Sequence, residues 1–138
     1  MTTFPIADKI QTSFARQSLM ATLGASLETV EDGRVVITAP ILQGAQQQHG
    51  FAHAGLTFAL GDSAAGYTAL SVMPAEAEVL TAEMKINLLA PGEGDRLIAE
   101  GRVIKPGRRL IVAGADVFAE KAGQRTLIAT LMGTLVPV

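Results

Sequence analysis

The spacing of hydrophobic positions changes along the chain, and each change marks a new element. Between residues 7 and 19, apolar side chains recur at roughly helical spacing, which predicts a short amphipathic helix. Residues 25–30 and 34–38 flank the turn Glu31-Asp32-Gly33 and predict a β-hairpin. A glutamine-rich loop, residues 40–52, then leads into the longest apolar stretch of the chain.

This stretch runs from His53 to Met73 and predicts a helix buried in a folded core. Its length, about 21 residues, would span roughly 31 Å as a helix, enough to cross a bilayer. However, Asp62 lies in its middle, Gly61 and Gly66 lower its hydrophobicity, and no Lys or Arg flanks it. We therefore expect a buried helix and no association with a membrane.

From residue 79 onward the pattern is that of β-strands separated by turn residues. The predicted strands are residues 79–89, 97–105, 110–118 and 126–136. Helix, two strands, long helix and four strands predict an α+β fold, in which one antiparallel sheet of sequentially paired strands curves around the long helix. Because we find no internal repeat and no linker, residues 1–138 are expected to form a single domain.

The composition of the chain excludes several classes of protein and partner. The chain has 138 residues, a mean hydropathy of +0.34 and no cysteine, which excludes a disordered chain and any thiolate nucleophile or iron–sulfur site. Eleven Lys and Arg against thirteen Asp and Glu give a net charge of -2, so we expect no nucleic-acid partner. The first ten residues lack the apolar core of a secretory signal, which favours a cytoplasmic location.

Both histidines of the chain, His49 and His53, lie in the segment that leads into the long helix. The first N–H groups of a helix lack acceptors inside the helix and carry a partial positive charge. Such a helix start binds anions, and it equally stabilises a carbonyl oxygen that becomes negative during acyl transfer. Small residues at Ala54 and Gly55 would let a carbonyl approach closely. Each histidine taken alone is equally well explained as a helix cap or a packed residue.

Asp62 follows His53 by nine residues. On a helical projection it shares a face with small residues and Phe58, whereas Thr57, Tyr67, Thr68 and Ser71 project from the opposite side. An unpaired buried carboxylate is unfavourable, so the position indicates either a catalytic or ligand-binding group or an ion pair across an interface. Combined with the helix start, a carboxylate at this depth is what hydrolysis of an activated acyl group requires.

The segment from His53 to Gly66 resembles the His-Gly-Gly…Leu-Ala-Asp signature of hotdog-fold acyl-CoA thioesterases, and the phenylacetate-degradation (PaaI-like) type is the most similar branch. The run Lys85–Gly92 and the turn Gly107-Arg108-Arg109 add to the resemblance, which covers residues 35–136 with its motif in 47–66. It implies a hotdog fold, hydrolysis of acyl-CoA or aryl-CoA thioesters, and a homodimer or homotetramer with active sites at the subunit interface. It implies no cofactor, because CoA is part of the substrate.

The resemblance also assigns roles to residues. Asp62 matches the catalytic carboxylate, which attacks the thioester or activates water. Ala54 matches a glycine whose N–H polarises the carbonyl, so alanine is a departure from the motif. Gln47 matches a loop amide that orients the water or the nucleophile, with Gln46 and Gln48 as neighbouring alternatives. His53 helps to position the substrate.

Contacts with CoA are expected from Gly55, Asn87, Arg108 and Arg109. Arg102, Lys105, Arg108 and Arg109 form a basic cluster that suits the CoA phosphates, although a solvated hairpin explains it as well. An acyl pocket has five aromatic or methionine candidates, although apolar residues at such spacings more often belong to the core: Phe51, Phe58, Tyr67, Met73 and Met84.

Two other functions remain open on the sequence. The first is a hotdog dehydratase or hydratase, although the chain has no His-Phe-Pro run and carries Ser63 near the place where a dehydratase glutamate is expected. The second is an acyl-CoA-binding module without catalysis.

Overall fold

The computed structural model describes residues 6–138, so the first five residues of the expected N-terminal segment lie outside it. The elements in chain order are α1 (Ile6–Ala15), α2 (Ser18–Thr22), β1 (Ser26–Glu31), β2 (Arg34–Pro40), η1 (Gln43–Ala45), α3 (Ala54–Leu70), β3 (Val79–Leu88), β4 (Arg96–Pro106), β5 (Ile111–Lys121) and β6 (Gln124–Pro137). This confirms the predicted α+β order. Within the described residues, no helix is both long enough and apolar enough to cross a bilayer.

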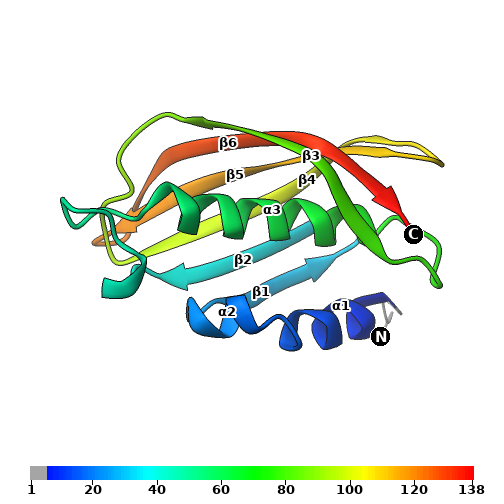
Figure 1. Cartoon of the computed structure of the whole chain (residues 1–138), viewed down its shortest axis with the longest axis horizontal. Helices are drawn as coiled ribbons and strands as arrows, with labels where there is room; N and C mark the ends of the chain where they lie inside the picture. The colour runs from blue at the N-terminus through cyan, green and yellow to red at the C-terminus, as the bar shows by residue number, and fades with distance from the viewer. Residues whose placement is uncertain (1–5) are drawn as a thin grey trace.

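The six strands form one antiparallel sheet in the order β1-β2-β4-β5-β6-β3, and α3 lies against one of its faces (Figure 1). Tight turns join β1 to β2 and β5 to β6, and a short loop joins β4 to β5 in a third hairpin. Each of these consecutive pairs is hydrogen-bonded, as predicted.

Strand β3 does not pair with β4, and here the expectation of sequential pairing is wrong. It pairs instead with β6 at the edge of the sheet, from Val79 opposite Pro137 to Leu88 opposite Ala129. The connection to β4 is residues 89–95, which can reach about 23 Å when extended. Crossing two intervening strands needs only about 14 Å. A loop of this length therefore leaves the choice of partner to the packing of the core.

The predicted N-terminal helix is two helices, because the chain bends at Gln17, whose backbone is extended (φ -79°, ψ 100°). In one continuous helix, Ile10 and Met20 would point about 80° apart around the axis. With the bend, both are buried. The two short helices lie beside β1, at the opposite edge of the sheet from β3 (Figure 1).

Two of the polar residues that the projection placed opposite Asp62, Thr68 and Ser71, bind strand β2 and the turn before it. Thr68 Oγ1 accepts a hydrogen bond from the Val35 N–H of β2 at 3.1 Å. Ser71 Oγ accepts from the Gly33 N–H at 2.9 Å and donates to the Thr68 carbonyl at 2.6 Å. These bonds fix the rotation of α3 about its axis. They also coincide with the end of the helix at Leu70, three residues before the predicted Met73.

Candidate active site

The chain enters α3 at His53, which caps the helix. Its extended backbone (φ -63°, ψ 144°) is typical of an N-cap, and its Nδ1 accepts a hydrogen bond of 2.8 Å from the Gly55 N–H. Because Nδ1 is the acceptor, the proton of the neutral imidazole resides on Nε2. His53 is therefore a helix cap, one of the interpretations that the sequence left open, and its Nε2 takes no part in the capping bond.

Ala54 is the first residue of α3, and its N–H points out of the helix start. No acceptor among the described residues forms a hydrogen bond with this N–H, whereas the next N–H, that of Gly55, is already bound by His53. Apart from glycines, only Ala122 has a positive φ in the described part of the chain, so alanine fits at position 54 without strain. The departure from glycine leaves the backbone donor intact.

Gln47 stabilises the loop before α3. Its Oε1 accepts hydrogen bonds from the N–H groups of His49 and Phe51, the latter at 3.4 Å, and its own N–H donates to the Phe51 carbonyl at 2.9 Å. Gln46 instead donates to the Ile41 carbonyl. Of the two glutamines, Gln47 is therefore the one whose side chain shapes the turn toward the helix start.

Asp62 lies on the face of α3 that the sheet leaves least covered. Its Oδ1 accepts a hydrogen bond of 2.8 Å from Thr81 Oγ1 on β3. The side chain is half-exposed, and no cation among the described residues pairs with it. The expectation of a buried carboxylate is thus wrong for this chain taken singly, because the residues around position 62 face the open side of the fold.

Asp62 lines a pocket of about 230 Å³ that lies between the N-terminal helices, α3 and the start of β3. Its lining includes Ser13, Gln17, Tyr67, Glu78 and Thr81. Of the five apolar candidates for an acyl pocket, Tyr67 alone belongs to this lining. The helical projection had placed Tyr67 away from Asp62. The two meet because the pocket extends around the helix toward α1.

Sequence reasoning missed Thr81, Ser13 and Gln17. Thr81 belongs to β3, which pairs with a strand distant in sequence, so no local pattern links Thr81 to Asp62. Ser13 lies in the last turn of α1, and Gln17 lies at the bend that follows this helix. The one available signal was the position of two polar side chains beside an otherwise apolar helix stripe, which is too weak to indicate a site.

The helix start and the carboxylate are too far apart to act on one carbonyl within a single chain. Ala54 precedes Asp62 by eight residues, about 12 Å along the axis of α3. A reacting carbonyl would have to lie about 3 Å from both groups. Within one chain, therefore, the structure does not bring together Ala54 and Asp62.

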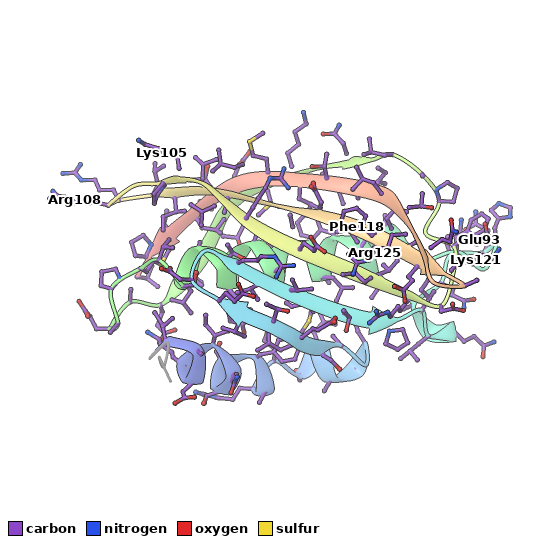
Figure 2. The ribbon with its side chains drawn as sticks, turned by 180° about the vertical axis from the view of Figure 1, so that it is seen from behind. Glu93, Lys105, Arg108, Phe118, Lys121 and Arg125 are labelled. Atoms are coloured by element: carbon purple, nitrogen blue, oxygen red, sulfur yellow. The ribbon has the colours of Figure 1, made fainter. Side chains whose placement is uncertain are left out.

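The basic hairpin is also remote from the helix start. Gly107 and Arg108 lie beside residues 72–74, just beyond the C-terminal end of α3. The helix start is tied to the other end of the molecule through the Ala52 N–H, which donates to the Gly92 carbonyl at 2.8 Å. Figure 2 shows Lys105 and Arg108 at one end, and Glu93 and Lys121 at the other. Asn87 is exposed on β3, opposite Thr130 in the register.

Two surface ion pairs shift the pKa values of their own groups. The hydrogen bond between Arg96 and Glu120, 2.9 Å long, lowers the pKa of Glu120 and raises that of Arg96. Lys121 Nζ lies 2.7 Å from Glu93, and this hydrogen bond raises the pKa of Lys121. The first pair joins β4 to β5, and the second joins the β3–β4 connection to the end of β5, where Figure 2 labels Glu93 and Lys121.

The curved antiparallel sheet against one central helix is the hotdog architecture, which this chain shares with proteins of the thioesterase class. The thioesterase superfamily model matches residues 49–126, more than half of the chain, and the protein belongs to this family. A thioesterase family protein from Silicibacter pomeroyi is 48% identical, with a TM-score of 0.93 over 96% of this chain and 97% of that one.

Two further proteins are similar to this chain, one in sequence and one in fold. A Saccharolobus solfataricus protein, named as a candidate esterase, is 30% identical over 83% of this chain and 73% of its own length. The structure of the PaaI protein of the E. coli phenylacetic acid degradation operon shares the fold, with a TM-score of 0.83 at 22% identity over 93% of this chain and 89% of that one.

Proposed function

We propose that this protein hydrolyses acyl-CoA thioesters to the free acid and CoA. The observation that carries the proposal is the Asp62 carboxylate, which is held by Thr81, opens into a pocket and has no cation paired with it in the described chain. A carboxylate bound to Lys or Arg would be a poor nucleophile or base, whereas this one is free to react.

Asp62 acts in one of two ways. As a nucleophile, a carboxylate oxygen bonds to the thioester carbon, the C–S bond breaks and CoA leaves as the thiolate, after which water cleaves the mixed anhydride. As a general base, Asp62 takes a proton from a water molecule while the water oxygen bonds to the same carbon; the C–S bond of the resulting tetrahedral intermediate then breaks, and the CoA thiolate leaves and takes up the proton held by Asp62. In both cases negative charge develops on the carbonyl oxygen, and the Ala54 N–H is the donor suited to stabilise it.

The donor and the carboxylate would come from two copies of the chain. Asp62 and Ala54 are about 12 Å apart along one helix, so a complete site requires Ala54 of a second copy. Strand β3 is an edge of the sheet, and its Leu80 and Leu88 are 58% and 57% exposed. An edge strand of ten residues with exposed leucines is a surface suited to pairing with another β3. We take the assembly to be a homodimer at least, with a homotetramer as the alternative.

The remaining predicted contacts follow from this arrangement. Gln47 would orient the water or the nucleophile through its amide NH₂, because its Oε1 is engaged within the loop. Gly55 donates its N–H to His53, so it would serve CoA by allowing close approach rather than by hydrogen bonding. Asn87, Arg108 and Arg109 are candidates for the nucleotide end of CoA, on exposed segments.

The test is release of free thiol from a panel of acyl-CoA esters by the native protein and by Asp62→Asn. We expect turnover by the native protein and a loss of at least a hundredfold in kcat for the variant. Asp32→Asn, an exposed carboxylate in the β1–β2 turn, is the matched control and should retain activity. Undiminished turnover by Asp62→Asn would contradict the assignment. CoA-ester binding without turnover by the native protein would instead favour a binding module.

A further inference from the structure

The pocket beside Asp62 contains a second polar group, remote from the carboxylate. Gln17 Nε2 donates a hydrogen bond of 2.7 Å to Tyr67 Oη, and Ser13 Oγ lies 3.0 Å from the same oxygen. Ser13, Gln17 and Tyr67 line the pocket together with Asp62. These three side chains, which we name the phenol cluster, come from α1, the bend before α2, and α3.

The phenol cluster is neutral and retains hydrogen-bonding capacity. A phenol donates one bond and accepts two, an amide has two N–H groups and a carbonyl, and a serine hydroxyl both donates and accepts. The two hydrogen bonds within the cluster therefore leave several of its donors and acceptors unused. A ligand hydroxyl or carbonyl placed here would find donors and acceptors already oriented by one another.

Charge around the pocket argues against an anionic ligand end. No Lys or Arg lines it, whereas two carboxylates, Asp62 and Glu78, do. Lys9 lies 3.6 Å from Glu78 and pairs with it from outside the pocket lining, so Asp62 is the carboxylate of the lining that has no paired cation among the described residues. An acyl group ending in a carboxylate would meet the charge of Asp62, and no Lys or Arg lines the pocket to bind it.

The spacing of Asp62 and Tyr67 along α3 gives the scale of the acyl group. Tyr67 follows Asp62 by five residues, which is about 7.5 Å along the helix axis and about 140° around it. Six bonds of an extended chain, from a thioester carbon to a terminal oxygen, also cover about 7.5 Å. The volume of about 230 Å³ lies below the range of about 300–1,000 Å³ that is usual for drug-sized ligands. The pocket is therefore suited to a short acyl group.

We infer that the phenol cluster selects short acyl groups that end in a neutral hydrogen-bonding group, a hydroxyl or a carbonyl, over alkyl and carboxylate ends of equal length. This inference rests on the proposed thioesterase activity, with the thioester carbon at Asp62. It makes Tyr67, Ser13 and Gln17 residues that determine specificity, and it assigns them no part in bond cleavage.

The experiment compares three esters that differ only at the far end: omega-hydroxyhexanoyl-CoA, hexanoyl-CoA and adipoyl-CoA. With the native protein we expect kcat/KM to be about five- to tenfold higher for the hydroxy ester than for hexanoyl-CoA, the usual worth of one net hydrogen bond, and lowest for adipoyl-CoA. Tyr67→Phe removes only the hydroxyl and should bring the ratio of the first two esters close to one. Gln17→Met should reduce the same ratio.

A control separates recognition from helix docking. Lys9 Nζ donates to the carbonyls of Ala75 and Ala77, so Lys9→Met loosens α1 without removing a group that lines the pocket. It should leave the ester ratio unchanged. If Lys9→Met abolishes the preference as Tyr67→Phe does, the cluster only docks the helix and the inference is wrong.

Calorimetric binding of the hydroxy and alkyl esters to Asp62→Asn tests the inference independently of turnover. We expect the hydroxy ester to bind about five- to tenfold more tightly, with the difference lost in Asp62→Asn/Tyr67→Phe. Equal or weaker binding of the hydroxy ester overturns the inference even if thiol is released. Absence of thiol release from every ester refutes the proposed function, and the binding ratio still decides the specificity of the pocket.

Discussion

Thr81 on the edge strand β3 donates a hydrogen bond of 2.8 Å to Oδ1 of Asp62 on α3. This bond fixes one carboxylate oxygen, and no donor among the described residues binds the other. Oδ2 is therefore free of protein donors in the described chain. The strand that orients the carboxylate is also the edge strand at which we propose pairing with a second copy, so such pairing would act directly on the position of Asp62.

Replacing Thr81 should weaken catalysis without abolishing it. Thr81→Val keeps the shape and removes the donor, so we expect kcat to fall about three- to tenfold while the acyl-CoA KM changes little. Steady-state kinetics of thiol release measure both. Thr81→Ser retains the hydroxyl and should keep most of the activity. Equal kcat values for Thr81→Val and the native protein would show that the bond does not orient the reacting carboxylate.

Ala54→Pro should remove the proposed oxyanion donor while preserving the helix. Position 54 is the first helical residue, where proline is tolerated because its missing N–H has no intrahelical acceptor. The extended backbone of His53 also suits a residue before proline. We expect kcat to fall by about 10²–10³ with a near-native melting temperature, measured by kinetics and circular dichroism.

The matched control for the proline variant is Ala54→Gly, which restores the residue of the resembled motif. Because Ala54 already has an allowed φ, glycine should leave kcat within about twofold and should lower helix stability only slightly. If the proline variant is fully active, the carbonyl is polarised elsewhere.

The parts of the fold that depend on neighbouring residues could be predicted from the sequence. The β1–β2 turn at Gly33 and the start of α3 at His53 were found because each depends on a few adjacent side chains: a turn glycine with φ +79° and an N-cap. The position of Asp62 on the long helix followed from periodicity alone.

The parts that depend on long-range packing could not be predicted. The pairing of β3 with β6 is decided across the whole sheet, and with it the contact of Thr81 with Asp62. The bend at Gln17 accompanies the burial of both Ile10 and Met20, which the periodicity of a single helix does not specify. The meeting of Tyr67 with Ser13 and Gln17 depends on both and was therefore not foreseen.

Gly101→Ala should destabilise the fold without touching the site. A Cβ at Gly101 of β4 would lie 2.5 Å from the Ala64 carbonyl oxygen of α3 and would collide with Thr68 Oγ1. The carbonyl belongs to the helix backbone and cannot turn away, and the Thr68 hydroxyl is bound to the Val35 N–H. We expect a loss of about 2–4 kcal/mol in the free energy of unfolding, measured by urea denaturation.

Gly123→Ala is the contrasting variant, because the space around its Cβ position is open within 4 Å. Its positive φ of +80° should make it mildly unfavourable, by about 1 kcal/mol. If Gly101→Ala is no less stable than this turn variant, the close approach of α3 to β4 does not exclude a side chain at position 101.

The basic hairpin provides a test of how CoA is held. Arg108 and Arg109 lie beyond the far end of α3 from Ala54, so they can contact the nucleotide of a bound CoA only if the ester extends between copies of the chain. Guanidinium groups bind phosphate oxygens through charge-assisted hydrogen bonds. We expect Arg108→Ala/Arg109→Ala to raise the acyl-CoA KM about tenfold, with kcat within twofold, because nucleotide binding is the same in the ground and transition states.

The control is the N-acetylcysteamine ester of the same acid, which carries no nucleotide and should show equal KM values for the variant and the native protein. If KM stays at the native value for the CoA ester, the hairpin is a solvated turn and the phosphates are bound elsewhere.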